Sequence, residues 1–245
     1  MIPPEAGGGA PPGALPSPAG ATRLVRLPGT TGGAVVWRTR LVPAPEDERS
    51  ARLDADDRRR LADLPPDAAA RLLARRVLLR RAVGQECGAD PDGVRLLPGP
   101  GPRRVAAPDG RVLFTSASSS GEQGLLVLAE RPVGVDLERL PGPPDARDVA
   151  LALLPPRERD WVLAGGQDLA ARFLAVWVRK EAVVKATGEG LARDLASFVV
   201  DPGCDGALVG GQELASRRLR TWGLAVPGHA AALATGDDGA PAAGP

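Results

Sequence analysis

Apolar and polar residues follow two periods along this chain, one typical of helices and one typical of strands. Leucines and valines recur at helical spacing over residues 67–83, with arginines on the opposite face, which predicts a helix that Gly84 and Gly88 end. The same pattern predicts a short helix over residues 156–163 and a long one over residues 168–187. The chain is therefore expected to contain both helices and strands.

Shorter apolar runs predict the strands. They cover residues 112–114, 125–128, 133–137, 197–200, 219–226 and 230–234. A helix followed by strands thus occurs twice, and the division lies near Arg131 and Pro132. The two halves share no obvious sequence repeat, so an internal duplication is a hypothesis that rests on the order of elements alone.

Both ends of the chain are rich in Pro, Gly and Ala, which predicts a disordered lead over residues 1–21 and a disordered tail over residues 236–245. The lead has neither a basic start nor an apolar stretch, so it does not resemble a secretory signal. No run of about 18 apolar residues is present, which argues against a membrane span. We expect a cytoplasmic protein with an N-terminal half at residues 22–130 and a C-terminal half at residues 131–235.

The composition narrows the classes of function. The 245 residues include 31 basic and 30 acidic side chains, a balance that argues against nucleic-acid binding through bulk charge. The chain has one histidine, His229, and two cysteines, which are too few for a histidine-rich zinc site. We expect His229 to be structural. Cys87 and Cys204 could form one disulfide, although two isolated cysteines are more typical of reduced thiols in a cytosol.

The first candidate site is the segment from Gly134 to Glu138, which reads GVDLE. Strand geometry places Asp136 and Glu138 on one face, about 7 Å apart, with Val135 and Leu137 on the other. A hard ion such as Mg²⁺ suits this carboxylate pair, because phosphate and water can complete its coordination. An acidic strand face exposed to solvent would give the same sequence.

The second candidate lies on the long helix. Residues at every fourth position form one column on its surface: Phe173, Trp177, Glu181 and Lys185. One interpretation is an aromatic pair in the core beside a solvated ion pair that contributes about 0.3–0.5 kcal/mol. In the other interpretation, the aromatic residues anchor a helix that directs the carboxylate and the ammonium into a cleft. Gly188 and Gly190 would then allow the tight loop that follows.

Together the two segments resemble the signature of the 4′-phosphopantetheinyl transferases. The first is GVDLE at residues 134–138, and the second is WVRKEAVVKATGEGL at residues 177–191. The length of the chain is similar to that of the larger, Sfp-like type, and the resemblance covers roughly residues 50–235. It implies an α+β fold that is a pseudo-dimer of two similar halves, each a helix packed on a small, mostly antiparallel sheet, with the active site at the junction.

The resemblance also implies an activity. Members of the family transfer the phosphopantetheine arm of coenzyme A to a serine of an apo acyl- or peptidyl-carrier protein and release adenosine 3′,5′-bisphosphate. By similarity, Asp136, Glu138 and Glu181 hold Mg²⁺, Glu181 is the base for the serine, and Lys185 contacts a phosphate oxygen. Glu158 matches a glutamate that is common between the two motifs. A functional monomer that serves polyketide or nonribosomal peptide biosynthesis is implied as well.

The nucleotide end of coenzyme A is expected to contact the N-terminal half. Candidate cations for its 3′-phosphate are Arg59, Arg71 and Arg103, the last at a turn where the family has a lysine. Ser118 and Ser119 align with a Ser-His pair of the family, so a serine replaces the histidine that helps to hold the nucleotide. Because serine carries no charge, weaker affinity for coenzyme A or compensation by an arginine is implied.

Two alternatives stay open. A different Mg²⁺-dependent transferase would need a phosphate-binding loop of the G-x-x-x-x-G-K-[ST] type, which the chain lacks. A diverged, non-catalytic module that binds coenzyme A or a carrier protein is favoured by the replaced histidine. The retention of Asp136, Glu138, Glu181 and Lys185 argues against that module.

Overall fold

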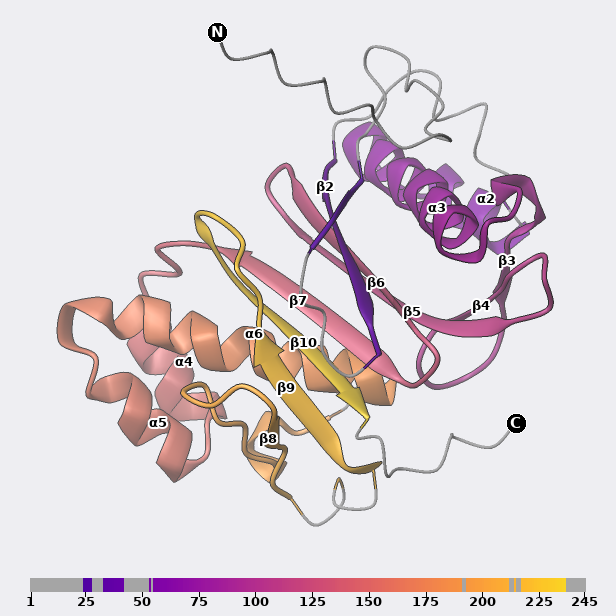
Figure 1. The fold of residues 1–245 in the computed structure, drawn as a ribbon. Coiled ribbons are helices and arrows are strands. Elements are labelled where there is room, and N and C mark those ends of the chain that lie inside the picture. The colour runs from indigo at the N-terminus through magenta and orange to yellow at the C-terminus, as the bar shows by residue number, and fades with distance from the viewer. Residues whose placement is uncertain are drawn as a thin grey trace, which may run out of the picture.

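The computed structural model of the chain describes residues 24–27, 33–41, 53, 55–190, 193–211, 214 and 217–236. Within these residues, helices combine with two antiparallel sheets, which confirms the expected α+β class (Figure 1). Residues 1–21, the expected disordered lead, lie outside the described residues. The same holds for the expected tail beyond Gly236.

The first sheet has six strands in the order β1-β2-β6-β5-β4-β3. The strands are β1 (Val25–Arg26), β2 (Val35–Arg40), β3 (Arg95–Leu97), β4 (Arg104–Ala106), β5 (Val112–Ser120) and β6 (Gln123–Ala129). The helices of this half are α2 (Ala55–Ala62), α3 (Pro66–Cys87) and the short 3₁₀ helix η1 (Pro91–Gly93). Helix α3 covers one face of the sheet, where Leu79 and Val83 share a buried cluster with Leu126 and Leu128 of β6.

The second sheet has four strands in the order β7-β10-β9-β8. They are β7 (Val133–Arg139), β8 (Ala207–Leu208), β9 (Leu219–Gly223) and β10 (His229–Gly236). The helices are α4 (Ala146–Leu153), α5 (Pro156–Leu163) and α6 (Leu169–Thr187), with 3₁₀ helices η2 (Gly166–Asp168) and η4 (Leu195–Ser197). No helix among the described residues is long and apolar enough to cross a membrane.

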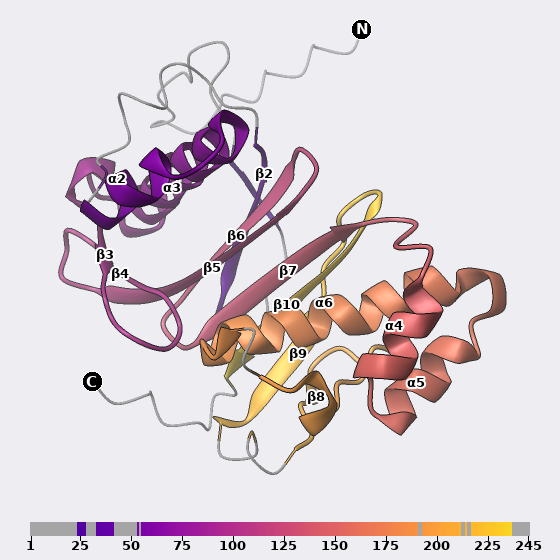
Figure 2. The same ribbon diagram turned by 180° about the vertical axis from the view of Figure 1, so that it is seen from behind.

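The elements stack in four layers, α3, first sheet, second sheet and α6 (Figures 1 and 2). Val127 of β6 meets Val135 and Leu137 of β7 in the apolar layer between the two sheets. On the outer face of the second sheet, Val183 of α6 packs with Leu219 of β9. Each sheet is thus covered by one long helix, and residues of both helices can reach the seam between the sheets.

Two elements differ from the prediction: the first long helix, in its C-terminal end, and the strand over residues 197–200. Helix α3 passes through Gly84 to Cys87, and Gly88 ends it in the left-handed conformation, φ +62°. Gly84 lies inside the helix, and its missing side chain lets the following loop pack against it, because an added Cβ would lie 2.8 Å from the carbonyl oxygen of Ala89. The strand expected over residues 197–200 is wrong, because only an isolated bridge between Val199 and Gly210 forms there.

Gly134 sets the distance between β7 and α6. An added Cβ would lie 1.9 Å from the carbonyl oxygen of Ala182 and 2.6 Å from the backbone nitrogen of Ala186. Since these are backbone atoms of a packed helix, the clash cannot be relieved by a side-chain rotation. The strand that carries Asp136 and the helix that carries Glu181 are therefore held in direct backbone contact.

We expect Gly134→Ala to lower the free energy of unfolding by about 1–3 kcal/mol, the usual cost of overpacking. Urea unfolding measures this value, and Gly236→Ala on the neighbouring strand is the control, because nothing lies within 4 Å of its added Cβ. Equal stability of the two variants would contradict the packing argument.

Candidate functional site

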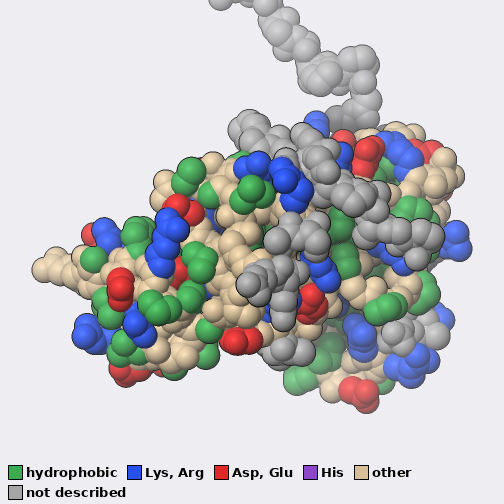
Figure 3. Space-filling view, turned by 90° about the horizontal axis from the view of Figure 1, so that it is seen from below, with side chains coloured by type: hydrophobic (Ala, Val, Ile, Leu, Met, Phe, Trp, Pro, Cys, Tyr) green, Lys and Arg blue, Asp and Glu red, His purple; other side chains and the backbone are tan. Residues whose placement is uncertain are grey.

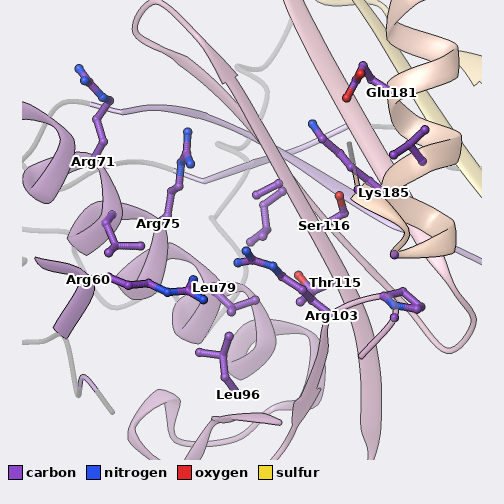
Figure 4. Close-up of a pocket in the computed structure, with 18 of the residues that line it drawn as sticks. Arg60, Arg71, Arg75, Leu79, Leu96, Arg103, Thr115, Ser116, Glu181 and Lys185 are labelled. Carbon is purple, nitrogen blue, oxygen red and sulfur yellow. The ribbon is translucent and has the colours of Figure 1, made fainter. Parts of the chain in front are cut away.

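A cavity of about 1220 Å³ is lined by residues of both halves of the chain (Figure 4). From the N-terminal half, it is lined by arginines of α2, α3 and the loop before β4: Arg60, Arg71, Arg75, Arg76 and Arg103. From the C-terminal half, it is lined by residues of α6 and the loop that follows: Trp177, Glu181, Lys185, Gly188, Gly190 and Arg193. The cavity thus unites a cationic wall with a wall that carries an acid and a lysine.

The two walls meet where α6 ends. Gly188 caps α6 in the left-handed conformation, φ +73°, and its backbone lies against Gly101 and Pro102. An added Cβ would lie 2.0 Å from the carbonyl carbon of Gly101. Because only a hydrogen fits there, glycine lets the end of the helix approach the loop that carries Arg103. Lys185, on the last turn of the same helix, lines the same cavity.

The cationic wall concentrates positive charge that the whole chain does not have. Basic side chains outnumber acidic ones around the cavity, whereas they are interspersed with acidic ones on the face that Figure 3 shows. Burial lowers the pKa of Arg75, and the charges of Arg71 and Arg76 lower it further. Burial also lowers the pKa of Arg103, and the positive charges of Arg76 and Arg60 lower it further. Since guanidinium groups stay charged, this mutual repulsion favours a bound anion.

Strand β5 presents its serines to two different partners. Ser119 faces α3, and its hydroxyl oxygen accepts a hydrogen bond from Arg75. Ser118 faces the second sheet, and its hydroxyl donates to Oδ1 of Asp136 at 2.7 Å. Ser119 is therefore bonded to an arginine of the cationic wall, whereas Ser118 contacts a carboxylate.

Asp136 lies buried on β7, with 3% of its surface exposed. Lys185 donates from Nζ to Oδ1 of Asp136 at 2.6 Å, so this oxygen has two donors. The other oxygen, Oδ2, is buried and has no partner among the described residues. Glu138 points to the same side of the strand, and Ser120 donates to its Oε2 at 3.1 Å.

The acids at the site perturb one another. Burial raises the pKa of Glu181, and the negative charges of Asp136 and Glu138 add to the shift, whereas Lys185 opposes it. Burial also raises the pKa of Glu138, with Asp136 as the next contribution. A bound cation would relieve both effects.

The oxygen donors of this region fit a hard divalent ion such as Mg²⁺. Asp136, Glu138 and Glu181 supply carboxylates only, and the unpartnered Oδ2 of Asp136 is a buried acceptor that needs a cation or a donor. In the described part of the chain, no three His, Cys, Asp or Glu side chains already form a group that could hold a metal ion. The cation that Asp136 contacts here is the ammonium of Lys185.

The structure brings seven of the thirteen predicted site residues to this cavity, and Asp136, Glu138, Ser118 and Ser119 are not among the residues that line it. Arg71, Arg103, Glu181 and Lys185 line the cavity, together with Trp177, Gly188 and Gly190. Arg59 is not among the lining residues, whereas its neighbour Arg60 is. The sequence reasoning also missed Arg75, which could have been found from its position one helical turn after Arg71.

The aromatic anchor lies beside a second, smaller cavity. The ring of Phe173 lies 5.6 Å from that of Trp177, measured between centroids. Both rings line a cavity of about 380 Å³ that Glu138 also borders. Trp177 therefore separates the two cavities and supports the column that carries Glu181.

The remaining motif residues have structural partners. Lys180 is fully buried, contacts Glu158 at 2.8 Å, and donates to the carbonyl oxygens of Leu195 and Phe198. This buried pair ties α5 and α6 to the segment after the cavity. His229 contacts the carbonyl oxygen of Pro227 at 2.8 Å, and both cysteines are free.

Sequence comparison agrees with the geometry. Residues 132–234 match the family described as the 4′-phosphopantetheinyl transferase superfamily. A 4′-phosphopantetheinyl transferase of Bacillus subtilis is 28% identical over 159 residues, which cover 63% of this chain and 69% of the relative. The matched residues 132–234 carry both motifs, so the C-terminal half of the chain is similar to the 4′-phosphopantetheinyl transferase superfamily.

Proposed function

We propose that this protein transfers the 4′-phosphopantetheine arm of coenzyme A to a serine of an apo acyl- or peptidyl-carrier protein and releases adenosine 3′,5′-bisphosphate. One observation carries the proposal: a single cavity joins the arginines of the first half to Glu181 and Lys185 of the second. A substrate that is anionic at one end and reacts at a diphosphate matches these two walls. We further propose a monomer of the larger, Sfp-like type, located in the cytoplasm and serving polyketide or nonribosomal peptide biosynthesis.

In this proposal, the cationic wall binds the nucleotide end of coenzyme A. Arg71 and Arg75 lie one turn apart on α3, and Arg103 lies in the loop before β4, so that the anion can be contacted from two sides. Guanidinium groups suit phosphate because they offer paired N–H donors in one plane. The bond between Arg75 and Ser119 supports compensation by an arginine for the missing histidine, which weakens the main argument for a non-catalytic module.

The opposite wall performs the transfer. Glu181 accepts the proton of the carrier serine as the serine oxygen bonds to the β-phosphorus, and the bond from that phosphorus to its bridging oxygen breaks. Lys185 neutralises charge on a phosphate oxygen. Asp136, Glu138 and Glu181 would hold Mg²⁺, which when bound neutralises the diphosphate and the departing phosphate.

Adenosine 3′,5′-bisphosphate is the product that tests this reaction. We expect chromatography to show one equivalent released per carrier protein, and none when the acceptor serine of the carrier is replaced by alanine or when EDTA is present. Coenzyme A binding without nucleotide release would favour the diverged binding module. Release that does not depend on the carrier would indicate hydrolysis.

We expect Arg75→Gln to weaken binding of coenzyme A by about tenfold or more, because a charge-assisted hydrogen bond to phosphate contributes about 1.5–3 kcal/mol. Calorimetry with coenzyme A and 3′-dephospho-coenzyme A measures the affinity. Arg59→Gln is the control, because Arg59 does not line the cavity. Equal effects of the two substitutions would remove Arg75 from the binding wall.

A further inference from the structure

Three serines alternate on the face of β5 that turns toward β7. They follow Phe114, which belongs to the apolar layer between the sheets, so hydroxyls replace apolar groups along the same strand face. Ser116, Ser118 and Ser120 all bond to the edge of β7, although the two strands belong to different sheets.

These bonds differ in what they hold. The Ser116 hydroxyl accepts from the backbone nitrogen of Val135 at 3.2 Å, so Ser116, which also lines the larger cavity, holds no carboxylate. The Ser118 hydroxyl donates to Oδ1 of Asp136 at 2.7 Å, and the Ser120 hydroxyl donates to Oε2 of Glu138 at 3.1 Å. Two of the three serines therefore fix carboxylates.

The two donors to Asp136 fix the orientation of its carboxylate. Ser118 and Lys185 both donate to Oδ1, which fixes the plane of the carboxylate and leaves Oδ2 buried without a partner among the described residues. Of these two donors, the ammonium of Lys185 offsets part of the negative charge of the carboxylate, whereas the hydroxyl of Ser118 orients the carboxylate without adding charge. The arrangement therefore orients one oxygen of Asp136 for a cation.

We propose that Ser118 and Ser120 are positioning residues that orient Asp136 and Glu138 for the divalent metal. The N-terminal half would thus shape the metal site as well as bind the nucleotide. The assignment rests on the proposed function, and it gives Ser118 a carboxylate as partner instead of the coenzyme A contact that the family resemblance implied. Partners that orient metal ligands in this way typically change metal affinity by 10–100-fold.

Mn²⁺ binding tests the assignment without turnover. The full-length protein is titrated with MnCl₂ in the presence of coenzyme A and without carrier protein, and free Mn²⁺ is measured by electron paramagnetic resonance, with coenzyme A alone as the blank. We expect Ser118→Ala and Ser120→Ala to weaken Mn²⁺ binding by about 10–100-fold. Ser118→Thr, which keeps the hydroxyl, should restore most of the affinity.

Ser116→Ala is the matched control, because it removes a hydroxyl from the same strand face without touching a carboxylate. Its affinity for Mn²⁺ should equal that of the wild type, and thermal unfolding and the coenzyme A affinity are recorded for all variants. A loss of Mn²⁺ affinity in Ser116→Ala as large as in Ser118→Ala would reduce the serines to structural contacts and overturn the assignment. Weaker coenzyme A binding in Ser118→Ala with unchanged Mn²⁺ binding would also overturn it.

Two further outcomes separate this inference from the proposed function. If the wild type binds no Mn²⁺, both the metal assignment and the role of the serines are wrong. If Mn²⁺ affinity depends on Ser118 and Ser120 but no carrier protein is modified, the positioning role stands while the proposed transfer fails.

Discussion

Glu181→Gln should lower the rate of phosphopantetheine transfer by about 10²–10⁴-fold, the usual contribution of a general base. The amide keeps the shape of the side chain but cannot accept the serine proton. Glu181 lines the cavity on the side opposite the cationic wall, so affinity for coenzyme A should change far less than the rate. Single-turnover kinetics and calorimetry measure the two quantities separately.

The same substitution should not reduce stability at neutral pH. Burial, Asp136 and Glu138 raise the pKa of Glu181 in the folded state, so its charged form is less favourable there than in the unfolded chain. Stability is therefore lost as pH rises from the unfolded pKa through the raised folded pKa, and a neutral amide removes this cost. Glu122→Gln, which changes an exposed carboxylate paired with Arg40, is the control and should keep the wild-type rate. Near-wild-type transfer by Glu181→Gln would remove Glu181 from the mechanism.

Gly188→Ala should reduce both coenzyme A affinity and transfer, with a loss of transfer of about 10²-fold, because a displacement of about 1 Å at a reacting centre has an effect of that size. The added Cβ would lie 2.0 Å from Gly101 and 2.3 Å from the nitrogen of Pro102, so the two walls of the cavity must separate. Arg103 and Lys185 would then no longer face a common ligand. Steady-state kinetics with coenzyme A varied measures the effect.

Gly190→Ala separates this clash from backbone strain. Both glycines have positive φ, +73° and +63°, but nothing lies within 4 Å of a Cβ added at Gly190. Each alanine therefore carries the cost of a left-handed conformation, about 1–2 kcal/mol, whereas only the one at position 188 pushes the halves apart. Equal losses of transfer in the two variants would show that close approach at Gly188 is not what assembles the cavity.

The two-residue period of strands and the four-residue spacing of helices predicted side-chain orientation best in elements whose two faces have different neighbours. Val135 and Leu137 lie in the apolar layer between the sheets, as the two-residue period requires, and Asp136 and Glu138 lie on the opposite face. The column from Phe173 to Lys185 likewise lies on one side of α6, from the aromatic pair to the cavity.

Sequence periods failed where tertiary contacts decide the structure. Strand β2 (Val35–Arg40) was missed because Val36 and Trp37 are buried on opposite faces, so its apolar residues do not alternate at the start of the strand. The strand expected over residues 197–200 does not form, since the backbone nitrogen of Val200 donates to Glu158 at 2.6 Å instead of to a long neighbouring strand.

Side-chain partners across the two halves could not be read from spacing either. No pattern within β5 connects Ser118 to Asp136, because the two strands belong to different sheets. The same limit applies to Arg75, whose bond to Ser119 depends on how α3 packs over the first sheet. The sequence predicted that an arginine could compensate for the missing histidine, and the fold identifies a candidate.

The mass of a carrier protein tests the central claim most directly. An apo acyl- or peptidyl-carrier protein is incubated with this protein, coenzyme A and Mg²⁺, and intact-mass spectrometry is applied to the carrier. The account predicts the gain of one phosphopantetheine arm, which is absent with EDTA, with a carrier whose acceptor serine is replaced by alanine, and with the Glu181→Gln variant. An unchanged mass across acyl- and peptidyl-carrier proteins, while coenzyme A still binds, would contradict the account.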